Sequence, residues 1–197
     1  MDFHVVAAFG GATLGIVSFI PYYRDIFNGS TKPHLFTWAI WTLLTGLTAV
    51  IQGSTGGGIG AMVAAVESVS CLGVALLSIT RGEKEITRSD WACLVLGLLA
   101  IVLWLLVHQP LLAVFLVVTA DLMGFVPTFR KSFYRPHEET ALQFGISASH
   151  WAVSIFALRS LALVEWLYPA AIATMDSALV IMLLARRRQL ARTAAHD

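Results

Sequence analysis

The sequence predicts an all-α membrane protein with seven transmembrane helices, arranged as two three-helix units joined by a linker helix. Two observations predict this fold class. Hydrophobic residues make up 57% of the 197-residue chain and charged residues only 13%, whereas a water-soluble domain has about 25% charged residues. In addition, one helix end in the first half of the sequence is repeated in the second half, which is typical of a duplicated unit.

Seven apolar segments qualify as membrane spans, since a helix of about 20 residues crosses the hydrocarbon core of a bilayer. Short segments rich in glycine, proline and charged residues separate them and mark the predicted loops. The predicted spans are His4–Phe27, Leu35–Gln52, Gly57–Thr80, Arg88–His108, Pro110–Phe133, Thr140–Leu158 and Ala162–Ala185. The boundary at Gln109-Pro110 is the weakest of these, and without it two spans would fuse into an implausibly long helix.

The repeat relates residues 13–25 to residues 119–131. Each copy contains a small residue, an aromatic residue, a branched aliphatic residue, a proline and then a basic residue. Spans 3 and 7 also align, with Glu67-Ser68 against Asp176-Ser177. Because one linker span separates the two units, both have the same orientation, as in a parallel repeat. The predicted division is residues 1–80 (first unit), 81–109 (loop and linker span), 110–186 (second unit) and 187–197 (basic tail).

Lysine and arginine lie almost entirely on one side of the predicted membrane. With an external N-terminus, the cytoplasmic side holds every Lys and Arg except Arg159. Since cytoplasmic loops carry an excess of basic residues, the sequence predicts an integral protein of a bacterial inner membrane with its C-terminus in the cytoplasm. The net charge of +1 gives no basic field for nucleic acid.

Four ionisable residues lie near the middle of predicted spans, where a charged side chain costs about 2.5–3.5 kcal/mol on insertion scales. They are Glu67 in span 3, Asp121 in span 5, His150 in span 6 and Asp176 in span 7. Such residues normally face the bundle interior or a water-filled cavity. Glu67 and Asp176 occupy matching positions in the two units, so we expect them to face one another across a central cavity. The alternative for all four is a structural hydrogen bond.

Small and polar residues recur at helical spacing and predict one shared cavity. The stripes are Gly11, Gly15, Ser18 and Tyr22 in span 1; Thr37, Trp41, Thr45 and Thr48 in span 2; Val117, Asp121, Gly124 and Thr128 in span 5; and Gln143, Ser147, His150 and Ser154 in span 6. Besides the four ionisable residues, we expect Trp41, Ser68, Gln143 and Ser177 to contact a small polar solute there. Packing contacts between helices are the alternative for the serines and threonines.

Pro21 and Pro127 lie about one turn inside the predicted cytoplasmic ends of spans 1 and 5. A proline inside a helix removes a backbone hydrogen bond and bends the helix. These prolines are therefore candidate hinges for a cytoplasmic gate, with a static kink as the alternative. Trp38 and Trp166 lie near the predicted interfaces and fit an aromatic belt.

The repeat, the linker span and the two prolines resemble the PQ-loop superfamily, which includes the SWEET sugar transporters and lysosomal amino-acid carriers. In that family the proline is usually followed by glutamine, where this sequence has Tyr22 and Thr128. In SWEET-type members a pair of asparagines on the third and seventh helices contacts the sugar. The resemblance places Glu67 and Asp176 at those positions, and carboxylates instead of amides favour a cationic substrate or proton coupling.

Together, the resemblance and the midplane acids predict a transporter of a small polar or cationic solute that works by alternating access. A ligand-binding receptor or scaffold on the same fold, a SWEET-type sugar uniporter and a passive channel are the alternatives. No enzyme is expected, since the sequence contains neither HExxH nor GxSxG, and no cofactor or metal is expected. The expected partners are a small-molecule substrate, the lipid bilayer and protons, without nucleic acid; a homo-oligomer is left open.

Overall fold

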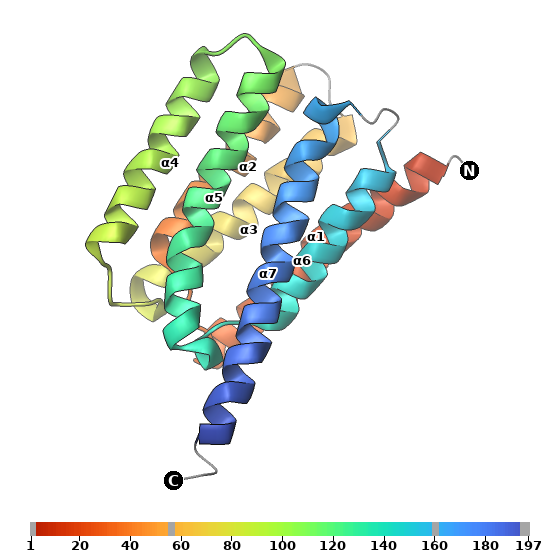
Figure 1. Ribbon diagram of the computed structural model, residues 1–197. Coiled ribbons are helices and arrows are strands. Elements are labelled where there is room, and N and C mark those ends of the chain that lie inside the picture. The colour runs from red at the N-terminus through yellow and green to blue at the C-terminus, as the bar shows by residue number, and fades with distance from the viewer. Residues whose placement is uncertain (1–2, 55–57, 159–161, 194–197) are drawn as a thin grey trace.

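The protein is a bundle of α-helices, and the computed structural model describes residues 3–54, 58–158 and 162–193 (Figure 1). Within these ranges the helices are α1 (Phe3–Phe27), α2 (Leu35–Ser54), α3 (Gly58–Arg81), α4 (Arg88–Leu106), α5 (Pro110–Tyr134), α6 (Ala141–Phe156) and α7 (Leu163–Thr193), with one 3₁₀ turn, η1 (Pro136–Glu138). Each predicted span corresponds to one helix, which confirms the all-α fold class. Arg159, the exception in the predicted topology, lies outside the described residues.

Five of the described helices, α1, α3, α4, α5 and α7, are long and apolar enough to cross a membrane. The apolar stretch of α2, Leu35–Val50, is shorter. Helix α6 has 16 residues and spans about 24 Å, less than the roughly 30 Å of a hydrocarbon core. Large apolar side chains of α4, including Val95, Leu99 and Leu106, are more than half exposed, and such a surface suits lipid better than water. The helices fit an integral membrane protein.

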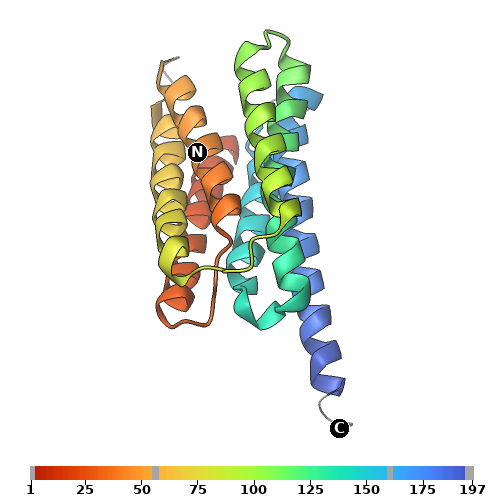
Figure 2. The ribbon, with the colours of Figure 1, turned by 90° about the vertical axis from the view of Figure 1, so that its left-hand side faces the viewer.

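The helices form two groups that lie side by side, with α1, α2 and α3 in one group and α4 to α7 in the other (Figure 2). Corresponding pairs pack in both groups: α2 packs against α3 as α6 packs against α7, and α1 contacts α3 as α5 contacts α7. Between the groups, α1 packs against α6 and α2 against α5. The same contacts thus recur when helices 1–3 are exchanged for helices 5–7, as expected of a duplicated unit.

Small residues on α1 allow the close contact between α1 and α6. The stripe predicted on this helix, Gly11, Gly15, Ser18 and Tyr22, is buried, which confirms that it faces the bundle. A Cβ atom added to Gly11 would lie 3.1 Å from the Ser154 hydroxyl of α6. Glycine at this position therefore lets the two backbones approach, a common device between membrane helices.

The largest side chains of the core are aromatic. Tyr22, Trp38, Phe125 and Phe144 are each at most 1% exposed, and Trp38 Nε1 donates a hydrogen bond to the Tyr22 hydroxyl at 3.1 Å. The prediction that Trp38 belongs to an interfacial aromatic belt is therefore wrong. Its position in the first turn of α2 favours the interface, but its indole points inward and packs against Phe19 and Tyr22 of α1.

Ion pairs concentrate at one end of the bundle, which we call the charged end; it comprises residues 28–34, 82–87 and 135–140. Lys131, near the end of α5, forms an ion pair with Glu139 of the charged end, and both side chains are at most 1% exposed. The Lys131 ammonium also donates to the carbonyl oxygens of Lys32 and Glu138, at 2.8 and 2.9 Å, so all three of its N–H groups have acceptors. Lys32 pairs with Glu138 at 2.6 Å. These contacts join the loop after α1 to the loop after α5.

A second connection at the charged end joins the loop after α3 to the end of α5. Arg135 contacts the Glu83 carboxylate at 3.3 Å. Burial raises the pKa of the Glu83 carboxyl, but hydrogen bonds from the backbone N–H groups of Glu85 and Lys84, together with the Arg135 charge, outweigh burial and lower it. Glu83 is therefore ionised at neutral pH and holds Arg135 across the two groups of helices.

Helix α7 continues to Thr193, so the tail predicted from residue 187 onward is helical as far as that residue. Arginine, glutamine, leucine and alanine all have high helix propensity. The Arg186 side chain donates to the Phe133 carbonyl oxygen at 3.0 Å and lies 4.2 Å from the centre of the Phe133 ring. Arg187 donates to two carbonyl oxygens of the charged end. These contacts fix the extension against the rest of the protein.

Removal of the Lys131 charge is expected to destabilise the protein strongly. The Lys131→Met variant leaves the Glu139 carboxylate buried and unpaired, which costs about 3–5 kcal/mol. Thermal unfolding in detergent measures this loss. The matched control is Arg24→Met, because the Arg24 side chain is 62% exposed and an exposed pair contributes at most about 1 kcal/mol. Similar unfolding temperatures for the two variants would contradict a structural role of the buried pair.

Stability is expected to fall as the pH falls from 6.5 to about 4, because of His34. Burial lowers the pKa of this imidazole from 6.5 to about 4, and the adjacent Asp90 carboxylate opposes this shift only in part because it already pairs with Arg130. Between these two pH values the unfolded chain binds a proton that the folded protein does not. The free energy of unfolding therefore falls by up to about 3 kcal/mol. Unfolding temperatures measured against pH should show a weaker decline in His34→Gln; an unchanged decline would exclude His34 as its source.

Candidate functional site

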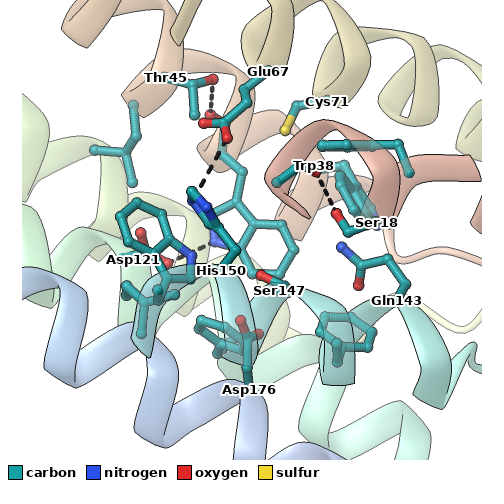
Figure 3. A pocket seen from close by; sticks show the side chains of 18 of the residues that line it. Ser18, Trp38, Thr45, Glu67, Cys71, Asp121, Gln143, Ser147, His150 and Asp176 are labelled. Carbon is teal, nitrogen blue, oxygen red and sulfur yellow. Dashed lines mark hydrogen bonds and ion pairs between the residues drawn. The ribbon is translucent and has the colours of Figure 1, made fainter. Parts of the chain in front are cut away.

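A cavity lies near the middle of the bundle, among α1, α2, α3, α5, α6 and α7 (Figure 3). It brings together six of the predicted site residues: Trp41, Glu67, Asp121, Gln143, His150 and Asp176. Three of these carry carboxyl groups, and the described lining contains neither lysine nor arginine. The cavity is therefore an acidic site enclosed by helices, and each acid has different neighbours.

Asp121 is held by two hydrogen bonds from two other helices. The Trp41 indole N–H of α2 donates to Oδ1 at 2.8 Å, and the Tyr168 hydroxyl of α7 donates to Oδ2 at 2.7 Å. A Cβ atom added to Gly124 would lie 3.1 Å from the Trp41 nitrogen, so this glycine makes room for the indole. Asp121 thus links α5 to α2 and α7, and both of its oxygens have a donor.

Glu67 interacts with His150 rather than with Asp176. Glu67 Oε1 lies 3.7 Å from His150 Nε2, while His150 Nδ1 lies 2.6 Å from the Gly11 carbonyl oxygen. A Cβ atom added to Gly15 would lie 2.7 Å from the Glu67 carboxyl and 3.2 Å from the imidazole. Glycine at position 15 therefore provides the space that this pair occupies between α1, α3 and α6.

Asp176 and Gln143 leave hydrogen-bond acceptors unused inside the cavity. Their side chains line it from α7 and α6, and the two residues are 2% and 5% exposed. Asp176 Oδ2 and Gln143 Oε1 have no hydrogen-bond partner within the described protein, and Ser147 lines the cavity beside them. Since buried acceptors without a donor are costly, this part of the cavity suits a ligand that supplies N–H or O–H groups or a positive charge.

Aromatic rings form much of the cavity wall. Trp38, Phe125 and Phe144 of the aromatic core also line the cavity. Trp151 and Tyr168 line it as well, and their rings meet edge to face with centres 5.2 Å apart. Aromatic faces attract cations within about 6 Å, most strongly where water is excluded. The combination of carboxyl groups and aromatic walls favours a positively charged ligand over a neutral one.

A second cavity adjoins the first and extends away from the charged end. The two share Leu44, Thr45, Glu67, Trp151 and Tyr168. The second adds residues from the halves of α2, α3, α4 and α5 that are remote from the charged end: Thr48, Ala64, Trp104, Ala113, Val114 and Val117. Glu67 therefore lies where the two cavities meet, whereas Asp176 lines only the first.

The structure does not bring every predicted residue to the cavity. The Ser68 hydroxyl donates to the Thr42 carbonyl oxygen at 3.1 Å, and the exposed Ser177 hydroxyl donates to the Ala173 carbonyl oxygen at 2.7 Å. Glu67 and Asp176 line the same cavity but have no mutual contact, and Figure 3 shows His150 and Ser147 between them. The two serines were predicted at the site because each directly follows an acid in the sequence, but neighbouring residues on a helix point in different directions.

The proposed hinges, Pro21 and Pro127, are buried inside α1 and α5, and both helices continue past them. They lie between the cavity and the charged end, beside the core residues Tyr22 and Phe125. The hinge and the static kink therefore both remain predictions.

Tyr168 and Trp151 are site residues that the sequence analysis missed. Both lie in the parts of their helices that are remote from the charged end, where the sequence alone favours an interfacial aromatic residue. The available signal was helical spacing, since Tyr168 lies eight residues before Asp176 and Trp151 four residues after Ser147. Among the described residues, no group of three or more His, Cys, Asp and Glu side chains could hold a metal ion.

Comparisons with known proteins add no identification. No protein-family model, curated protein or solved structure matches the chain. The assignment of function therefore depends on the site itself.

Loss of either donor to Asp121 is expected to destabilise the protein. Trp41→Phe and Tyr168→Phe each leave one buried carboxylate oxygen without its partner, at a cost of about 1–3 kcal/mol. Thermal unfolding in detergent measures both. Trp91→Phe is the matched control, since Trp91 is 56% exposed and should change stability by no more than about 0.5 kcal/mol. Equal stability of all three variants would show that the two hydrogen bonds are dispensable.

Proposed function

We propose that this protein transports a small organic cation across a membrane by alternating access. The observation that carries the proposal is the central cavity, which combines three carboxyl groups and aromatic walls with no lysine or arginine in its described lining. Carboxyl groups buried midway along apolar helices are rare and are usually functional. A cation is the ligand that such a site would attract most strongly.

The unused acceptors indicate the chemical form of the cation. Asp176 Oδ2 and Gln143 Oε1 can each accept a hydrogen bond, and the nearby aromatic faces suit an alkylated ammonium group. We infer a substrate with a quaternary or substituted ammonium and at least one donor group. A neutral sugar would supply the donors but would leave the negative charge of the site uncompensated.

The symmetry of helix packing supports alternating access. The recurring contacts between corresponding helices support the expected arrangement of two parallel three-helix units with α4 as linker. Transporters with such repeats rock one unit against the other around a midplane site. Ion pairs and aromatic side chains close the charged end, while the second cavity extends the other way. We interpret this conformation as one in which the site communicates with the end opposite the charged end.

We assign the charged end to the cytoplasm. Its loops, together with the helix ends that adjoin them, carry most of the basic residues, in accordance with the excess of Lys and Arg on the cytoplasmic side. The N-terminus would then lie outside and the C-terminal extension of α7 inside, in a membrane such as a bacterial inner membrane. The resemblance to PQ-loop transporters agrees with this arrangement.

Uptake by reconstituted protein tests the proposal. Choline is a suitable probe because it combines a quaternary ammonium group with one hydroxyl donor. We expect saturable uptake into proteoliposomes and counterflow of labelled choline by wild type, and a loss of at least about tenfold in Glu67→Gln and Asp176→Asn, because each removes a charge worth more than about 1.4 kcal/mol in a buried site.

The control for the uptake experiment is Glu165→Gln. Glu165 lies exposed in the first turn of α7, outside the cavity, so its loss should leave uptake within about twofold of wild type. Normal transport by both cavity variants would overturn the assignment of the site. Binding of choline without flux would indicate a receptor instead of a carrier, and linear, non-saturating flux would indicate a channel.

A further inference from the structure

The contacts of His150 determine where its protons lie. The Gly11 carbonyl oxygen can only accept a hydrogen bond, and it lies 2.6 Å from His150 Nδ1. Nδ1 must therefore carry a hydrogen. The other ring nitrogen, Nε2, faces Glu67 Oε1 at 3.7 Å. The tautomer of the imidazole is thus fixed by the backbone of α1, on the side away from the carboxyl group.

This arrangement favours one additional proton between Glu67 and His150, which lie 3.7 Å apart. A neutral imidazole with hydrogen on Nδ1 has a lone pair on Nε2, and an ionised carboxylate offers only lone pairs. Two such groups do not attract one another. With one more proton, on either Nε2 or the Glu67 carboxyl, the interaction becomes favourable and the pair has no net charge. Without that proton the pair carries one negative charge.

The surroundings of the pair do not supply a compensating charge. The other titratable groups of the cavity are Asp121, Asp176, Cys71 and Tyr168, and none of them is basic. Both oxygens of Asp121 already accept a hydrogen bond, from Trp41 and from Tyr168. If the proton left Glu67 and His150, the cavity would gain a negative charge with no neighbouring positive group. An entering cation would provide that group.

We propose that the Glu67–His150 pair holds one exchangeable proton that leaves when a cation enters the cavity, so that the protein exchanges protons for organic cations. This inference rests on the proposed function. It adds that transport is coupled to protons and that the proton moves in the direction opposite to the cation. The proton passes to water on the side to which the cavity is connected, and the cation takes its place beside Glu67. For a monovalent cation the charge of the occupied cavity is the same in both states, so the exchange is electroneutral.

The position of the pair fits this role. Glu67 lies where the central and second cavities meet, so a proton released there has a route along the second cavity. Asp176 is deeper in the central cavity and lacks contact with the second. The two acids therefore have separate tasks: Glu67 exchanges the proton, and Asp176 supplies the unused acceptor for the cation.

Proteoliposomes with an imposed pH gradient test the exchange. For electroneutral one-for-one exchange, an interior more acidic by one pH unit should sustain about tenfold accumulation of labelled choline. A pH dye inside the vesicles should report loss of protons as choline enters. A potassium diffusion potential alone should drive no accumulation. Accumulation driven by the potential and indifferent to the pH gradient would overturn the proposal while leaving cation transport intact.

Variants separate the proton site from the cation site. Glu67→Gln is fixed in the uncharged state, so it should lose both the pH-driven accumulation and the dye signal, whereas Glu67→Asp should retain them. Asp176→Asn should raise the choline concentration needed for half-maximal uptake but keep the ratio of protons to choline. If Asp176→Asn abolishes the proton signal and Glu67→Gln retains it, the proton lies on Asp176 and the proposal is wrong.

One measurement is independent of any substrate. In ¹⁵N NMR spectra of histidine-labelled protein, identified by comparison with His150→Gln, Nδ1 of His150 should be protonated throughout the pH titration. The Nε2 signal should shift with pH in wild type, and in Glu67→Gln the same shift should occur at a lower pH because the negative charge that attracts the proton is gone. An unprotonated Nδ1, or an Nε2 signal that is insensitive to Glu67, would overturn the proposal even if choline proves not to be a substrate.

Discussion

The structure depends on one constraint: each carboxyl group buried among the apolar helices needs a hydrogen-bond donor or ion-pair partner from another helix. A carboxylate removed from water without partners would be strongly unfavourable. Asp121 obtains two donors, one from Trp41 on α2 and one from Tyr168 on α7. Glu67 obtains His150 from α6. These contacts require the helices of both groups to meet at the middle of the bundle, and the cavity lies where they converge. The packing of the fold and the chemistry of the site therefore have a common origin.

The two ends of the bundle are built differently. At the charged end, Lys131 and Glu139 form a buried ion pair and Arg135 reaches Glu83 of the other helix group. Salt bridges of this kind add modest stability but fix the geometry of the partners, since the loss of one member leaves the other unpaired. Away from the charged end, α4 and α5 present mainly apolar side chains beside the second cavity. The bundle thus has ion pairs at one end and a cavity toward the other, so it is asymmetric along its axis.

Hydropathy and loop composition predicted the helices well, because apolar stretches of this length have few alternatives in a membrane. The inward face of α1 also followed from the spacing of Gly11, Gly15 and Ser18. Side-chain direction was less predictable: Trp38 seemed interfacial but is buried, and Ser68 and Ser177 follow acids in sequence yet bond to helix carbonyls. The pairing of Glu67 with His150 depends on the approach of α6 to α1, a tertiary contact for which one sequence carries no direct signal.

The positions of Gly15 and Asp121 are equivalent in the sequence repeat, yet they have opposite roles. Gly15 leaves space for the Glu67 side chain of α3. Asp121 itself carries a carboxyl group, which accepts hydrogen bonds from side chains of α2 and α7. Two identical three-helix chains that associated as a dimer would carry the same residue at both places. A single polypeptide allows the two positions to differ, so that the two sides of one cavity can have unequal roles.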